Sequence, residues 1–205
     1  MKRKDMYSTV HFHVSSFVHV HFSINKRRLL SFLCHISKNI YNYALPLLYE
    51  DYDKNNRLTL TKYDLRKIYN SNDNFHIINT STAMMSVFRA YENFSSFLAL
   101  IRKNKGGHDV INRPRYLPKN GETTITTQSF NKISIDDKTY IKMPVSNDMR
   151  TGRIFHRCYA DSLIDDWIRR ISPEDTRKFY LPVPKEISGY DIKTVTIKRG
   201  TTSTG

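Results

Sequence analysis

A dense run of basic side chains lies between residues 102 and 119, directly after a segment rich in aromatic residues. Asp109 is its only acidic residue. Lysine and arginine side chains that neutralise phosphates supply most of the sequence-independent affinity of proteins for nucleic acid. The run therefore predicts contacts with a polyanion, although a solvated, lysine-rich loop would give the same pattern. Its six basic residues are Arg102, Lys103, Lys105, Arg113, Arg115 and Lys119.

The composition of the whole chain points the same way. Its 205 residues include 33 lysines and arginines against 19 acidic residues, which gives a formal net charge of +14 and an isoelectric point near 9.8. Nucleic acid and anionic membrane surfaces would both attract such a chain. The basic residues are interleaved with 13 tyrosines and 11 phenylalanines, a mixture that favours base stacking over headgroup binding.

Other classes of protein fit the sequence less well. The two cysteines, Cys34 and Cys158, lie far apart and outside any Cys-x-x-Cys pattern, so neither a zinc ribbon nor a disulfide framework is indicated. No apolar run reaches the roughly 18 residues of a membrane span, and residues 1–22 contain four histidines where a signal peptide would be apolar. We expect a soluble, intracellular protein without a signal peptide or membrane partner, from the cytoplasm of a prokaryote or of a virus-infected host.

Two groups of side chains could hold metal ions. Two His-x-His pairs permit a metal site but do not specify one, and a polar strand face is the alternative. A cluster of aspartates could serve a two-metal nuclease, but such acids more often form a solvated helix face, where Asp165 would pair with Arg169. The sequence therefore predicts no catalytic residue, no metal and no cofactor. The residues concerned are His11, His13, His19, His21, Asp161, Asp165 and Asp166.

The hydrophobic pattern predicts four helices. Apolar residues at steps of three and four indicate one helix that is capped by Asn25 and is kinked or ends near Pro46, with a polar linker at 51–57 after it. A capping pair, Thr61 with Asp64, begins a short helix that ends near residue 70. A long apolar stripe begins near residue 80 and ends at the glycines 106 and 107, and a fourth helix covers 159–171, before a helix-start signal at 172–174. On the first helix, the outward face is expected to carry Lys26, Arg27 and Lys38.

Alternating segments predict strands, so the fold class is α+β. The pattern over 10–22 indicates one long strand with a bend at its serine pair, because a hairpin turning at those serines would mix the apolar and polar faces. Three threonine-rich segments at 122–128, 132–135 and 139–143 read as a meander, and two later strands cover 179–183 and 192–198.

Several short motifs, taken in order, resemble a known family. They are NIYNYAL at 39–45, SVFRAYENF at 86–94 and RPRY at 113–116, followed by YIKMP at 140–144 and IKTVTIKR at 192–199. This order resembles the N-terminal half of TnpB, the OrfB-type, transposase-associated proteins of insertion sequences, which are related to Fanzor proteins and type V CRISPR effectors. The family's loop motif reads "P.F", and Tyr116 replaces its phenylalanine while keeping the ring.

The resemblance implies a wedge-like β-barrel interrupted by a helical recognition lobe, which together hold a guide RNA and DNA. Residues 1–24 would form the first barrel strand, 25–112 the lobe, 113–199 the rest of the barrel with an inserted helix near 159–171, and 200–205 a flexible tail. The family's RuvC-like carboxylates and zinc ribbon would follow residue 205, so this chain is expected to bind without cleaving.

The predicted binding residues fall into two groups. Phosphate contacts are expected from Arg89, Arg102, Lys103, Lys105, Arg113, Arg115 and Lys119, with Tyr116 as the stacking ring. A second group consists of Lys26, Arg27, Arg28, Lys62, Arg66 and Lys67. Two other interpretations stay open: a stand-alone DNA- or RNA-binding regulator, and a decayed transposase fragment with no specific ligand. The sequence does not indicate the oligomeric state.

Overall fold

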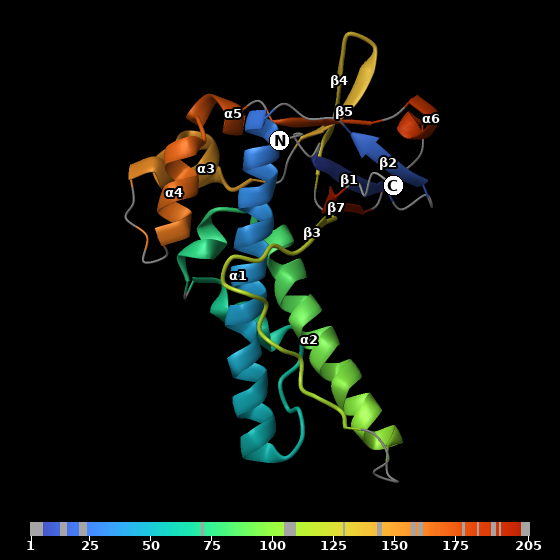
Figure 1. Cartoon of the computed structure of the whole chain (residues 1–205), viewed down its shortest axis with the longest axis vertical. Coiled ribbons are helices and arrows are strands. Elements are labelled where there is room, and N and C mark those ends of the chain that lie inside the picture. The colour runs from blue at the N-terminus through green and yellow to red at the C-terminus, as the bar shows by residue number, and fades with distance from the viewer. Residues whose placement is uncertain are drawn as a thin grey trace, which may run out of the picture.

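The protein has an α+β fold in which two long helices lie side by side and two small antiparallel sheets gather at one end of them (Figure 1). None of the described helices is long and apolar enough to cross a membrane. The computed structural model describes residues 6–12, 16–20, 24–70, 72–104, 110–128, 130–142, 145–156, 159, 162–177, 179–183, 185–189, 192 and 194–201.

Helix α1 (Ile24–Asn55) forms the spine of the molecule. Its apolar residues recur every three or four positions, and Leu29, Ile36 and Ile40 are completely buried. Of the two expectations at Pro46, a kink or an end, the end is wrong, because the helix continues to Asn55 and most of the linker expected at 51–57 is helical. Proline removes one backbone donor, but the buried neighbours Leu45 and Leu48 keep this stretch packed against the core.

Helix α2 (Thr80–Lys103) carries the predicted apolar stripe, and its side chains Met84, Val87, Phe94 and Leu98 are buried. Its N-cap is Asn79, whose side-chain oxygen accepts a hydrogen bond of 2.9 Å from the Thr82 amide. The helix ends at Lys103, before the glycines expected to terminate it, which lie outside the described residues.

Two short 3₁₀ helices, η1 (Asp64–Asn70) and η2 (Asp73–His76), connect α1 to α2. The predicted capping pair is confirmed. The Thr61 amide donates to Asp64 Oδ2 at 2.9 Å, and the Asp64 amide donates back to Thr61 Oγ1 at 3.3 Å. Since Asp64 begins η1, this reciprocal pair fixes the segment that enters it.

The first sheet has the strand order β2-β1-β7-β3, and its first two strands form a hairpin. The prediction of one long strand over 10–22 is therefore wrong. Val10 lies opposite Val18 and His11 opposite Phe17, so even-numbered positions pair with even-numbered positions. A turn centred on Ser15 and Ser16 would instead have paired even with odd positions. The strands are β1 (Met6–Phe12), β2 (Ser16–Val20), β7 (Val195–Thr201) and β3 (Ile125–Thr127).

The second sheet has the order β4-β5-β6, with β4 (Lys132–Ile135), β5 (Lys138–Lys142) and β6 (Tyr180–Pro182). The turn between β4 and β5 holds Asp136 and Asp137 at positive φ, as a two-residue hairpin turn requires. The expected meander is only partly right, because β3 leaves it to pair with β7. The described strands thus form two open sheets, and they do not close into the expected barrel.

Helical segments between the last strands pack beside α1. Helix α4 (Ser162–Arg170) and helix α5 (Pro173–Arg177) confirm the helix predicted over 159–171 and the start signal after it. Trp167 of α4 stacks on Phe32 of α1, with ring centroids 6.0 Å apart. The exposed ion pair on α4 joins Arg170 to Asp166 at 3.7 Å and is a different pair from the expected one.

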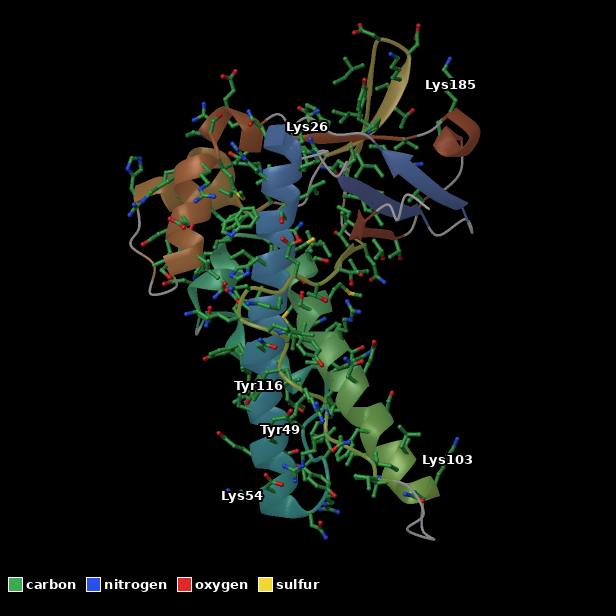
Figure 2. All side chains as sticks on the ribbon, viewed as in Figure 1. Lys26, Tyr49, Lys54, Lys103, Tyr116 and Lys185 are labelled. Atoms are coloured by element: carbon green, nitrogen blue, oxygen red, sulfur yellow. The ribbon has the colours of Figure 1, made fainter. Side chains whose placement is uncertain are left out.

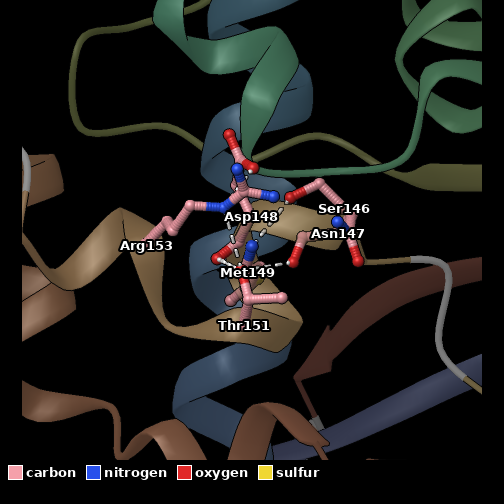
Figure 3. Close-up of polar contacts among 6 residues, drawn as sticks. All are labelled: Ser146, Asn147, Asp148, Met149, Thr151 and Arg153. Atoms are coloured by element: carbon pink, nitrogen blue, oxygen red, sulfur yellow. Dashed lines mark hydrogen bonds and ion pairs between the residues drawn. The ribbon is translucent and has the colours of Figure 1, made fainter.

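The sequence did not predict helix α3 (Asn147–Thr151), the 3₁₀ helix η3 (Arg153–His156) or helix α6 (Lys185–Ser188). Figure 3 shows how local contacts define the first two. Ser146 Oγ accepts a hydrogen bond of 3.0 Å from the Met149 amide and caps α3. Gly152, at a φ of 80°, ends it, and Arg153 turns back to Asp148 at 3.2 Å.

Candidate nucleic-acid interface

The predicted basic run leads into an extended segment that lies along α1. Residues 110–124 run back from the far end of α2 to β3, and we call them the strap (Figure 1). As the strap proceeds from Arg113 to Thr124, its partners on α1 recede from Asp53 to Ser37. The strap is therefore antiparallel to the helix.

The central attachment of the strap is Asn42. Its Nδ2 donates to the Leu117 carbonyl at 2.9 Å, and its Oδ1 accepts from the Leu117 amide at 2.8 Å. The side-chain amide thus satisfies both backbone groups of Leu117, as a neighbouring β-strand would. Asn42 lies in the NIYNYAL motif quoted from the sequence, but nothing in the pattern indicated that it would contact residues 110–124.

Further contacts continue along the same face of α1. Tyr49 donates from its hydroxyl to the Pro114 carbonyl. Burial raises the pKa of that phenol, and Tyr116 and Tyr41 add to the effect. The Thr123 amide donates to the Cys34 carbonyl at 3.3 Å. Helix positions 38, 42, 49 and 53 face one direction, because steps of four, seven and four return close to the same angle.

The position of Lys38 differs from the one predicted from the sequence. It was expected on the outward face, but only 2% of it is exposed and its ammonium donates to the Lys119 carbonyl at 2.6 Å. The expectation is wrong because the strap covers this face of α1. A lysine can be this deeply buried when backbone oxygens accept hydrogen bonds from its ammonium group.

The end of the strap nearest the α1 C-terminus is held by Arg113. Its guanidinium donates to both oxygens of Asp53, at 2.5 and 3.0 Å, and lies 5.7 and 5.5 Å from the ring centres of Tyr49 and Tyr52. The hydrogen bond from Arg113 lowers the pKa of Asp53, and the same bond raises the pKa of Arg113. Arg113 is thus placed as an anchor whose charge is compensated.

Two exposed cations of the strap have no ion pair within the described part of the chain, and one ring of the strap is exposed beside them. Arg115 and Lys119 make no ion pair with the described residues. Lys119 lies in a turn closed by a 2.8 Å hydrogen bond from the Gly121 amide to the Pro118 carbonyl. Tyr116 is 52% exposed and rests edge-on against Tyr49 at 6.0 Å, near the middle of α1 (Figure 2).

The other predicted residues are distributed over the molecule. Arg89 of α2 donates to Thr123 Oγ1 at 3.2 Å and to the Thr124 hydroxyl, so it joins the end of the strap near β3. Arg102 and Lys103 are exposed at the far end of α2, while the Lys26–Arg28 triplet begins α1 beside the sheets (Figure 2). Lys62, Arg66 and Lys67 gather at η1, away from these, and Lys105 lies outside the described residues.

The strap therefore brings together five predicted residues: Arg89, Arg113, Arg115, Tyr116 and Lys119. The helix positions that hold Lys119 and Arg113, 38 and 53, are separated by about 22 Å at 1.5 Å per residue. At 3.4 Å per base step this length matches roughly six phosphates of one strand. Within the described part of the chain, no group of three or more histidine, cysteine or acidic side chains could hold a metal ion.

Replacing Asn42 by alanine is expected to release the strap. The change leaves the amide and carbonyl of Leu117 unsatisfied and should cost about 1–3 kcal/mol of unfolding free energy. Trypsin should also cut after Arg115 faster than in the parent protein. Asn39→Ala is the matched control, because Asn39 contacts Asn74 of η2 and not the strap. Equal cleavage rates in the two variants would contradict the attachment.

The Asp53–Arg113 pair should respond to acid in a defined direction. Because the folded-state pKa of Asp53 is depressed, the pair stabilises the fold above the ordinary aspartate pKa of about 3.9 and is lost as the pH falls through the lower folded value. A carboxyl NMR titration should place the Asp53 midpoint below about 3.9. The Arg113→Gln variant should raise that midpoint, and an unchanged midpoint would show that Arg113 is not its cause.

Known proteins add no further constraint on the site. Comparison of the chain with family models, with curated proteins and with solved structures finds no match. The assignment of a function therefore rests on two sources: the geometry of the described residues, and the short motifs quoted from the sequence.

Proposed function

We propose that this chain binds the backbone of RNA and DNA through the strap and the helices that hold it. The observation that carries the proposal is the attachment of the strap to α1, which leaves Arg115, Tyr116 and Lys119 exposed in fixed relative positions. Cations of this kind contact phosphates, and an exposed ring between them can stack on a base. Because the strap is ordered before binding, little conformational entropy is lost on association.

The resemblance to TnpB gives the proposal its finer form. Three of the motifs meet at this surface: the 39–45 motif contributes Asn42, the 86–94 motif contributes Arg89, and the 113–116 motif forms part of the strap. We infer that the chain corresponds to the N-terminal, non-cleaving portion of a TnpB-like RNA-guided endonuclease. In this interpretation the helices are its recognition lobe, the sheets belong to its wedge-like barrel, and base pairing rather than protein contact reads the sequence.

Removal of the two exposed strap cations tests the binding surface. The double variant Arg115→Ala, Lys119→Ala should lower the affinity for single-stranded RNA and reduce the slope of log Kd against log salt by about 1.4, because each phosphate that is no longer neutralised contributes roughly 0.7. The melting temperature should hardly change, because both side chains are exposed. Fluorescence anisotropy over a salt series measures the slope.

A second double variant, Lys138→Ala, Lys185→Ala, serves as the control. It removes the same charge from two exposed residues on β5 and α6, outside the strap. The control should keep most of the salt slope. If both variants reduce the slope equally, the net charge of the chain accounts for binding and the strap has no special role. If the parent protein binds no nucleic acid, the proposal fails altogether.

The TnpB interpretation predicts a particular RNA partner. The chain, purified from its native host without nuclease treatment, should retain an RNA that sequencing traces mainly to one locus, because a guide RNA is a single structured species. The strap double variant should retain less of it. A retained pool that reflects the abundance of cellular RNAs would overturn the guide-RNA role while leaving general nucleic-acid binding intact.

A further inference from the structure

A hollow lies beside η1 and α2, and none of its lining residues makes one of the strap contacts described above. It occupies about 510 Å³ between the segment entering η1 and one side of α2. Its volume lies within the usual range for sites that hold one small molecule or one nucleotide. The lining residues are Thr61, Lys62, Tyr63, Tyr91, Glu92, Ser95 and Ser96.

Tyr63 is the most exposed large ring of this hollow. Its edge meets Phe88 of α2 at 6.0 Å, while Arg66 lies 5.1 Å and Lys62 5.4 Å from its ring centre. Even with these three contacts, 57% of Tyr63 is exposed. Both cations lie over the ring, and the part of it that stays exposed leaves surface for a nucleobase, with charges placed for the adjoining phosphate.

The segment that carries Tyr63 is held firmly in place. Asp51 accepts hydrogen bonds from the amides of Thr59 and Leu60 at 2.6 and 3.0 Å, and the capping pair of Thr61 with Asp64 follows. Burial acts to raise the pKa of Asp51, but hydrogen bonds from the Thr59 hydroxyl, the Leu60 and Thr59 amides and the Asn55 side chain together lower it. Asp51 and Asp64 are therefore engaged as acceptors, whereas Glu92, which lines the hollow, makes no hydrogen bond or ion pair with the described residues.

We propose that the hollow binds one unpaired guanine nucleotide of a single strand. The base stacks on Tyr63, Lys62 and Arg66 contact its phosphate, and the Glu92 carboxylate accepts hydrogen bonds from its Watson–Crick edge. Guanine presents two adjacent donors there, N1–H and the 2-amino group, which match the two oxygens of one carboxylate. Uracil presents one donor between two carbonyl oxygens, which the carboxylate repels. This inference rests on the proposed nucleic-acid binding and adds a base preference to it.

Two RNA strands that differ at one position test the inference. Both are uridine oligomers of about twelve nucleotides, within the range of single-strand site sizes, and one carries a central guanosine. At about 0.15 M salt, fluorescence anisotropy should show roughly tenfold tighter binding of the guanosine strand. Glu92→Gln should remove this preference, and Tyr63→Leu should weaken binding of the guanosine strand by about fivefold to a hundredfold, the usual contribution of base stacking.

Tyr63→Phe is the matched control, since it keeps the ring and should keep the preference. Equal binding of both strands by the parent protein would overturn the guanine site and leave the strap proposal standing. A preference that survives both Glu92→Gln and Tyr63→Leu would overturn it as well, because the guanosine would then be bound elsewhere. Failure of the parent protein to bind either strand would overturn both proposals, and the salt-slope experiment on the strap separates these cases.

Discussion

The hydrogen bonds between the strap and α1 are the constraint on which the helical lobe depends. An extended segment outside a sheet has backbone donors and acceptors that need partners when they are covered. Here α1 supplies these partners. The Asn42 side chain hydrogen-bonds the backbone of Leu117, the Lys38 ammonium donates to the Lys119 carbonyl, and the Cys34 carbonyl accepts from the Thr123 amide. Asn42 and Lys38 of α1 therefore hold an extended chain as a neighbouring strand would.

This arrangement also determines how much of the positive charge a ligand can meet. The formal net charge of +14 counts Lys38, which is buried beneath the strap, and Arg113, whose charge Asp53 compensates. Both cations stabilise the protein's own structure. Among the described residues, only two cations of the strap, Arg115 and Lys119, are both exposed and unpaired. The backbone that carries them is held in place by α1. In such a surface the position of a charge matters more than the total, because only aligned contacts release counterions from one strand.

The sequence predicts what is determined locally and fails where distant segments meet. The apolar periodicity of α2 and α4 and the Thr61–Asp64 capping pair were predicted because each depends on residues within a few positions. The placement of β3 beside β7 was not, because Ile125 and Ile197 are 72 positions apart and either could have paired elsewhere. The same reason explains why Lys38 was wrongly predicted to face outward. Amphipathic patterning assigns a polar residue to solvent, and only the strap, 81 positions later, makes that face an interior.

The two proposed contact regions share one helix, and this gives the lobe a consistent geometry. Arg89, Glu92 and Ser96 follow one another at three- and four-residue steps, so they lie along one side of α2. Arg89 contacts the strap end at Thr123 and Thr124, while Glu92 and Ser96 line the hollow. In the proposed binding mode a single strand contacts both the strap and the hollow. Contacts made by one strand reinforce each other through effective concentration, so a modest base preference at the hollow would select the register of a strand whose affinity comes mainly from the phosphate contacts along the strap.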